Sequence, residues 1–237
     1  DPLYDFKEKR LVKNLVHDLP LRTSALRTLG AFANVTALES FLNELALAAK
    51  IDPFDFRINH LKDKRGIDLL LDLKSQMLKD KQKPNHHRGI GFSRYKNLAA
   101  YCAVGIELQV TDDVDIKLAK AWISIDAGEI AYKDGIKYQA EGGLIQASSW
   151  CLYEDVKYDS HEIISKDWST YKIIGFDNIP KIKTSIIDRK GLPYLGVGEA
   201  VAGPTGGAIS NALYEALGKR IKIMPFTKEN IMNELLN

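Results

Sequence analysis

Five glycines crowd the twelve-residue stretch GVGEAVAGPTGG at residues 196–207, and one carboxylate, Glu199, stands among them. Glycine-rich loops serve two kinds of chemistry. Their backbone amides hold phosphate groups, or their lack of side chains lets a single reactive group approach a ligand closely. The residue types and their spacing therefore allow either a phosphate site or a catalytic carboxylate.

The phosphate interpretation fails at specific positions. Gly196 and Gly198 begin like the G-x-G-x-x-G fingerprint of dinucleotide-binding folds, but the third glycine belongs at position 201, which is Val. The stretch PTGG at 204–207 is not followed by the Lys and Ser or Thr of a P-loop. Both nucleotide interpretations are weak.

The carboxylate interpretation rests on the neighbours of Glu199, which are Gly198 and Ala200. These small residues let Glu199 approach a ligand, and we expect low-dielectric surroundings to raise its pKa toward the range of a general base. Because most glutamates in such loops are solvated surface groups, the local pattern alone leaves both roles open.

Helices are expected in the first third of the chain. The TALE stretch beginning at Thr36 has the form of a capping box, and Asp52 before Pro53 is typical of a second helix start. A third helix is predicted over residues 65–80, with one apolar face made of Leu69, Leu70, Leu73 and Met77.

The rest of the chain favours strands and two more helices. Alternating patterns predict strands at 98–110, 116–126 and 183–188, a helix at 204–218, a short strand at 221–224 and a last helix from Thr227. We expect an α+β fold with mixed sheets and packed helices. It would form one unit over 1–237, with a helical part at about 20–82 and a sheet-rich part at about 88–237.

Composition excludes several function classes. The 33 Lys and Arg residues and 31 Asp and Glu residues nearly balance and are not concentrated, so we expect no nucleic-acid partner. No apolar run is long enough to cross a bilayer, which predicts a soluble chain, cytoplasmic or periplasmic. Cys102 and Cys151 lie in apolar surroundings without C-x-x-C spacing, so no zinc or iron–sulfur site and no metal-ligating side chains are predicted.

Four blocks, in order, resemble the xanthine dehydrogenase and aldehyde oxidase family of molybdenum hydroxylases. They are LRTLG at 26–30 with DPFDFR at 52–57, YQAEGG at 138–143, STYKIIGFDNIP at 169–180, and GVGE at 196–199. The chain looks like the C-terminal molybdopterin-binding part of the much longer large subunit. The AFAN that follows the arginine loop resembles the branch of the isoquinoline 1-oxidoreductase beta subunit, which argues against a purine substrate.

The resemblance implies an oxidoreductase that hydroxylates an aldehyde or N-heteroaromatic carbon with oxygen derived from water. Glu199 matches the glutamate that takes a proton from a molybdenum-bound hydroxyl in this family. Arg27 matches the active-site arginine that stabilises negative charge on the substrate or orients it. A structural salt bridge from Arg27 to a carboxylate is an equally open interpretation.

The resemblance also implies a molybdenum–molybdopterin cofactor, in the cytosine dinucleotide form. Amide donors, a turn at 141–143 and a helix entrance at 203–207 would contact it. The predicted cofactor-binding residues are Gln139, Gly142, Gly143, Gln146, Gly198, Gly203, Thr205, Gly206 and Gly207.

The partners implied are the N-terminal remainder of the large subunit and a separate domain or subunit with 2Fe–2S clusters, with or without a cytochrome. The chain alone is therefore expected to be inactive. The alternative is a non-catalytic cofactor-binding or assembly domain whose active site has decayed.

Overall fold

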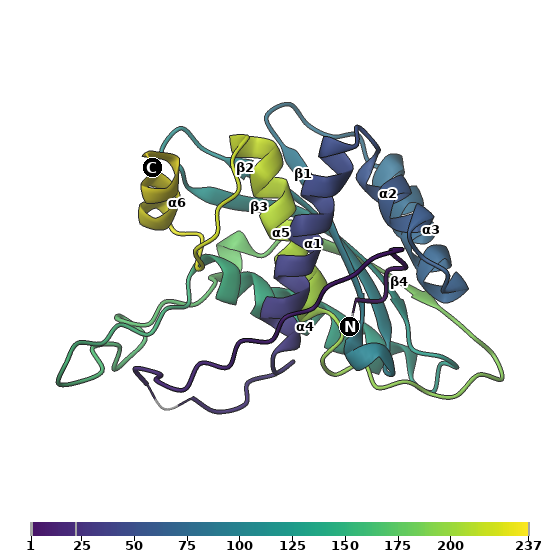
Figure 1. The fold of residues 1–237 in the computed structure, drawn as a ribbon, viewed down its shortest axis with the longest axis horizontal. Coiled ribbons are helices and arrows are strands. Elements are labelled where there is room, and N and C mark those ends of the chain that lie inside the picture. The colour runs from purple at the N-terminus through teal and green to yellow at the C-terminus, as the bar shows by residue number, and fades with distance from the viewer. Residues whose placement is uncertain (1, 22, 237) are drawn as a thin grey trace.

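The computed structural model describes residues 2–21 and 23–236, and these form helices packed on both faces of a four-stranded sheet (Figure 1). The helices are α1 (Ala31–Ala48), α2 (Pro53–Asn59), α3 (Lys64–Lys79), α4 (Lys133–Leu152), α5 (Ala202–Leu217) and α6 (Lys228–Leu236). The strands are β1 (His87–Arg94), β2 (Tyr101–Val110), β3 (Ile116–Asp126) and β4 (Lys181–Ile187), and the 3₁₀ turns are η1 (Tyr95–Asn97) and η2 (Phe176–Asn178).

The sheet has the order β1-β2-β3-β4 and is mixed. The first three strands are antiparallel neighbours, whereas β4 runs parallel to β3 because the long helix α4 lies between them in the chain. Along β2, Cys102, Val104 and Ile106 point to the core under α4 and α5, and Tyr101 and Ala103 point to the core under α3. This period of two gives the sheet two buried faces.

Two glycines let helix α5 lie directly against β1. A Cβ atom at Gly91 would stand 2.2 Å from the carbonyl oxygen of Pro204, and one at Gly89 would stand 2.2 Å from that of Ala208. Both glycines face α5 because they are two residues apart in the strand. This close approach fixes the start of α5, and the Glu199 loop leads directly into that start.

We expect Gly91→Ala to lower the free energy of unfolding by roughly 1–3 kcal/mol, because the added methyl group meets backbone atoms that cannot rotate away. Chemical denaturation measures the change. The matched control is Gly142→Ala, where a Cβ atom would meet nothing within 4 Å on helix α4 and should leave stability equal or slightly higher. Equal stability of the two variants would contradict this role for Gly91.

Several sequence predictions are confirmed. Helices α2 and α3 form where expected, and Asp52 caps α2 by accepting hydrogen bonds from the amides of Phe54 and Asp55. Strand β3 has the predicted bounds, and Gly218 ends α5 with a left-handed backbone at φ +67°. The mixed α and β architecture is likewise confirmed.

Other predictions are wrong for physical reasons. Helix α1 begins at Ala31, so Thr36 is no N-cap. Its hydroxyl instead donates to the carbonyl of Phe32 inside the helix. The turn predicted at 141–143 lies within helix α4, whose 20 residues tolerate its glycines. Strand β1 was not predicted because its glycines lower strand propensity, and residues 221–224 form no strand. The boundaries predicted for the unit remain a prediction.

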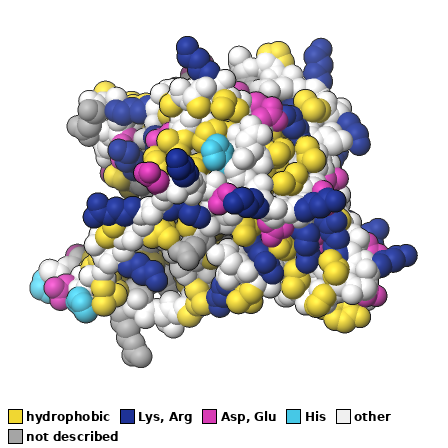
Figure 2. Space-filling model, turned by 45° about the vertical axis from the view of Figure 1, so that its right-hand side comes forward, with side chains coloured by type: hydrophobic (Ala, Val, Ile, Leu, Met, Phe, Trp, Pro, Cys, Tyr) yellow, Lys and Arg dark blue, Asp and Glu magenta, His cyan; other side chains and the backbone are white. Residues whose placement is uncertain are grey.

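Two exposed segments leave the body of the protein (Figure 1). Residues 7–26, excluding residue 22, form neither helix nor strand, and Leu15 in this segment is 79% exposed. The loop between α4 and β4 carries Trp168 and Phe176, which are 77% and 96% exposed. On the face in Figure 2, basic side chains are spread among acidic and hydrophobic ones. None of the helices in the described residues is long and apolar enough to span a membrane.

Candidate active site

Glu199 lies in the loop between β4 and α5, and two groups from distant parts of the chain hold its carboxylate. The backbone amide of Thr28 donates to Oε1 at 2.7 Å, and the hydroxyl of Tyr95 donates to Oε2 at 2.8 Å. Each oxygen keeps a further lone pair, so the carboxylate retains the capacity to accept a proton. Neither Thr28 nor Tyr95 was among the predicted site residues.

The expectation of a raised pKa for Glu199 is wrong. The hydrogen bonds from the amide of Thr28 and the hydroxyl of Tyr95 lower its pKa, and the positive charges of Lys96 and Arg27 lower it further. These groups outweigh the effect of burial, which is small because the residue is only partly buried. Glu199 is therefore ionised at neutral pH, which is the form that accepts protons.

Arg27 links three segments of the chain. Its Nε donates to the carbonyl of Gly198 at 2.5 Å, and its Nη1 donates to Oε1 of Gln146 at 3.1 Å. Its Nη2 donates to both the carbonyl and the side-chain oxygen of Gln139, at 3.2 and 2.9 Å. All four acceptors are amide oxygens, so the salt bridge to a carboxylate left open by the sequence is not the role of this arginine here.

One face of helix α4 supplies the other side of the cluster. Gln139, Gly143 and Gln146 follow the i, i+4, i+7 spacing, and a Cβ atom at Gly143 would stand 3.4 Å from Nη2 of Arg27. Since a guanidinium group only donates, both glutamines must turn their oxygens toward Arg27 and their NH₂ groups away from it. Both glutamines are exposed, so these NH₂ groups form a donor set suited to an anionic ligand.

The two turns that hold Glu199 have unusual backbones. Thr28 and Leu29 have φ values of +77° and +52°, and Lys96 and Asn97, next to Tyr95, have +50° and +58°. A β-branched residue such as Thr28 rarely adopts this conformation, and each such residue costs about 1–3 kcal/mol. The hydroxyl of Thr28 is also buried without a hydrogen-bond partner. Strain of this kind concentrates at functional sites.

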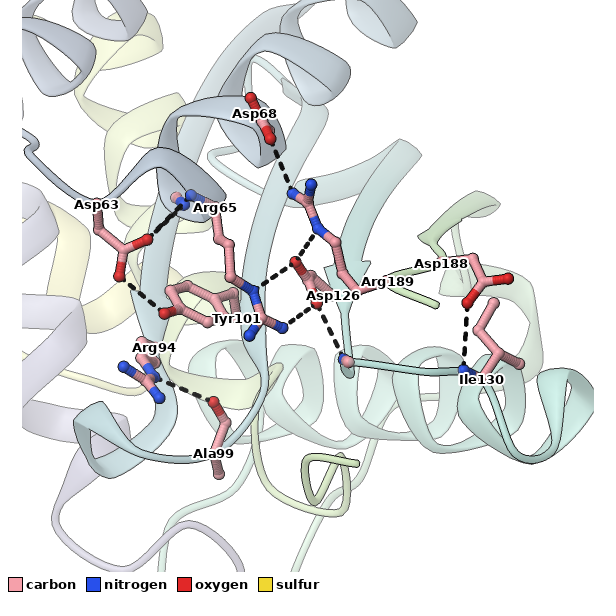
Figure 3. Close-up of polar contacts among 12 residues, drawn as sticks. Asp63, Arg65, Asp68, Arg94, Ala99, Tyr101, Asp126, Ile130, Asp188 and Arg189 are labelled. Atoms are coloured by element: carbon pink, nitrogen blue, oxygen red, sulfur yellow. Dashed lines mark hydrogen bonds and ion pairs between the residues drawn. The ribbon is translucent and has the colours of Figure 1, made fainter. Parts of the chain in front are cut away.

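An ionic network anchors the base of the Glu199 loop, as Figure 3 shows. Asp126, fully buried at the end of β3, accepts from Arg189 Nε at 2.8 Å, Arg65 Nε at 3.0 Å and the amide of Gly128 at 3.0 Å. Burial alone would raise the pKa of Asp126, but these bonds lower it overall. Arg189 also pairs with Asp68 at 3.0 Å, so the network ties the chain after β4 to β3 and α3.

Backbone bonds continue this anchoring toward Glu199. The amide of Leu195 donates to the carbonyl of Ala127 at 2.8 Å, and the amide of Ala100 donates to the carbonyl of Gly196 at 3.2 Å. A Cβ atom at Gly128, whose φ is +77°, would stand 2.0 Å from the carbonyl oxygen of Pro193. The loop is therefore held against the ends of β2 and β3.

The predicted site residues separate into two groups. Arg27, Gln139, Gly143, Gln146 and Gly198 gather around the Glu199 loop. Helix α5 begins at Ala202, and its first turns are buried against α1 and β1. There, Cβ atoms at two of its glycines would stand within 3 Å of α1 side chains. The cofactor role stays a prediction for the residues of this second group, Gly203, Thr205, Gly206 and Gly207, and for Gly142 on the open side of α4.

A cavity of about 310 Å³ opens beside the cluster. It reaches Gln139 on one side and Val197 on the other, and apolar side chains such as Ile136 and Leu195 line it. In the described part of the chain, no group of three or more His, Cys, Asp or Glu residues is placed to hold a metal ion. The arrangement offers an ionised carboxylate, amide donors and an adjoining cavity.

Comparisons with known proteins agree on one family. The molybdopterin cofactor-binding domain family matches residues 68–180. One of the nicotinate dehydrogenase subunits of Pseudomonas putida is 30% identical over 250 residues, which cover 97% of this chain and 21% of that protein. The beta subunit of isoquinoline 1-oxidoreductase from Brevundimonas diminuta is 24% identical over 206 residues, which cover 84% of this chain and 26% of that protein. The chain thus spans about a quarter or less of these relatives.

A solved structure shares the fold. The aldehyde oxidoreductase from Desulfovibrio gigas superposes with a TM-score of 0.73 over 90% of this chain and 42% of that one, at 14% sequence identity. The predicted resemblance is therefore confirmed by the family match, by the curated relatives and by the fold. The chain is a molybdopterin-binding part of the xanthine dehydrogenase and aldehyde oxidase family of molybdenum hydroxylases.

Proposed function

We propose that the chain supplies the proton-accepting carboxylate of a molybdenum-dependent oxidoreductase, which hydroxylates an aldehyde or N-heteroaromatic carbon with oxygen from water. The observation that carries this proposal is Glu199, held ionised with lone pairs on both oxygens to spare. When bound, the molybdenum cofactor supplies the oxygen atom that enters the substrate and accepts the electrons that leave it. Glu199 takes up the proton that this oxygen loses.

The donor set on helix α4 fits the anionic cofactor. Gln139 and Gln146 present their NH₂ groups away from Arg27, and the half-buried charge of Arg27 adds a positive field behind them. Side-chain amides and a guanidinium together favour phosphate or pterin oxygens. We propose that these residues hold the cofactor, in its cytosine dinucleotide form, while Gly198 lets it approach the loop.

Exposed apolar side chains support the need for further protein. Leu15 in segment 7–26, and Trp168 and Phe176 in the loop after α4, present hydrophobic surface that a folded chain normally covers. We propose that the remainder of the large subunit covers these segments. Electrons would leave through a separate domain or subunit with 2Fe–2S clusters, with or without a cytochrome, so the chain alone would be inactive.

The test is chemical analysis of the complete complex for molybdenum and pterin, with turnover measured on a panel of aldehydes and N-heteroaromatic compounds. The proposal expects both cofactor and hydroxylation. A complex without molybdenum overturns it. Molybdenum without hydroxylation of any panel member would support the second candidate, a cofactor-binding or assembly domain without chemistry, which the lowered pKa of Glu199 favours because a weak base is a poorer proton acceptor.

Arg27→Met should lower both the molybdenum content and the turnover of the complete complex, with turnover falling roughly tenfold or more. The variant removes four hydrogen bonds that join the arginine loop, helix α4 and Gly198. Metal analysis and steady-state kinetics measure the two effects. Arg10→Met, at an exposed position of the N-terminal segment, is the matched control. An Arg27→Met complex with full metal content and full turnover would exclude this role.

A further inference from the structure

Tyr95 is fixed more firmly than a tyrosine at a surface turn. Its amide donates to the carbonyl of Ala100 at 3.0 Å, and its carbonyl accepts from the amides of Leu98 and Ala99 at 3.2 and 3.0 Å. The residue is 7% exposed and packs against the core under α4 and α5. Its hydroxyl therefore has little freedom, and it ends 2.8 Å from Oε2 of Glu199.

The carboxylate of Glu199 is gripped from two sides by strained turns. Thr28 reaches Oε1 from a turn with φ +77°, and Tyr95 reaches Oε2 from a turn whose next two residues have φ +50° and +58°. Two separate turns in an unfavourable backbone conformation meet on one carboxylate. Such strain persists only where the surrounding structure determines it, which points to a constraint on this carboxylate rather than to packing alone.

The charged groups that face Glu199 come from two elements. Arg27 precedes α1, and Lys96 lies in η1 with its ammonium group 5.3 Å from the centre of the Tyr95 ring. Helix α4 contributes the neutral side chains of Gln139 and Gln146 to the same cluster. Burial and the Glu199 carboxylate raise the pKa of Tyr95 to about 12, so the phenol stays protonated and donates at every working pH.

We propose that Tyr95 is a positioning residue for Glu199, whose hydroxyl, together with the amide of Thr28, holds the carboxylate in one orientation and in its ionised form. This inference rests on the proposed function of Glu199. With Oε2 bound to Tyr95 and Oε1 bound to Thr28, the carboxylate cannot rotate, and its free lone pairs face a fixed direction. The proton acceptor is thereby oriented before any ligand arrives.

The experiment compares Tyr95→Phe with Tyr101→Phe in the complete complex. Tyr101 is also buried, at 2% exposure, and its hydroxyl donates to the carboxylate of Asp63 at 2.7 Å, away from Glu199. Both variants thus lose one phenol–carboxylate bond and keep the ring. Only Tyr95→Phe should raise the pH at which Glu199 becomes protonated, and it should lower kcat roughly tenfold with little change in KM.

Two readouts measure the change. Esterification of Glu199 by a diazo reagent requires the protonated carboxyl group, and peptide mass spectrometry across a pH series reports it with or without bound cofactor. The acidic limb of the pH–kcat profile is the second readout. Removing the donor destabilises the ionised form, so both midpoints should move to higher pH. Replacing Tyr95 with difluorotyrosine, a stronger donor, should move both to lower pH.

The outcomes separate the two proposals. If Glu199 esterification has the same pH midpoint in wild type, Tyr95→Phe and the difluorotyrosine protein, the inference about Tyr95 is overturned. An equal effect of Tyr101→Phe on that midpoint would also overturn it, because the effect would then be general to the fold. If turnover survives loss of the Glu199 carboxylate, the proposed function fails instead. The difluorotyrosine protein keeps the inference testable even if Tyr95→Phe folds poorly.

Discussion

Replacing Glu199 with Gln is expected to lower turnover of the complete complex by roughly 10²–10⁴-fold, while its molybdenum content stays at the wild-type level. The amide keeps the shape of the side chain. Its oxygen still accepts from the amide of Thr28, and its NH₂ group donates to the oxygen of Tyr95 in place of the lost acceptor. What disappears is the ability to take up a proton, so the loss should fall on kcat.

Glu141→Gln is the matched control, since Glu141 lies on helix α4 near the cluster but accepts from Thr184 Oγ1 at 3.2 Å instead of facing Arg27. It should keep full turnover. Metal analysis and steady-state kinetics on the same preparations separate loss of chemistry from loss of cofactor. If the Glu199→Gln complex retains both molybdenum and turnover, Glu199 is not the proton acceptor.

The candidate site was predictable to the extent that its residues lie in short contiguous blocks. Glu199, Arg27, Gln139 and Gln146 were found because each lies in a block with a recognisable order of residues. Tyr95 carries no such signal, since it follows a strand that was itself missed, and only the fold brings it to Oε2 of Glu199. The direction of the Glu199 pKa could not be predicted either, because it depends on those donors.

The fold shows the same division between local and long-range causes. Strand β3 alternates clearly and was located correctly, whereas β1 carries Gly89 and Gly91 for the sake of α5, a helix more than a hundred residues later in the chain. Helix α1 buries Glu39, Ser40 and Asn43 rather than an apolar stripe alone. A pattern of apolar residues cannot indicate a buried polar face whose partners lie elsewhere in the sequence.

Arg57→Met should lower the free energy of unfolding by roughly 3–5 kcal/mol, which is the expected cost of leaving a buried charge without its partner. Arg57 and Glu39 are both fully buried, and Nε of Arg57 lies 2.8 Å from Oε2 of Glu39. The same carboxylate accepts from the hydroxyl of Tyr4 at 2.8 Å and from the amide of Phe92 at 3.0 Å. Without Arg57, Glu39 stays buried beside α5 with only neutral donors.

The control Lys62→Met breaks an exposed ion pair, in which Lys62 and Asp5 are 83% and 47% exposed, and should cost about 1 kcal/mol or less. Adding Glu39→Gln to Arg57→Met should recover part of the loss, because no charge then remains buried. Chemical denaturation measures all three. If Arg57→Met costs no more than Lys62→Met, the buried pair does not stabilise the fold. A large loss with partial recovery would identify the charge on Glu39 as the origin of the instability, and it would place the anchor of α1 in this ion pair rather than in a helix cap.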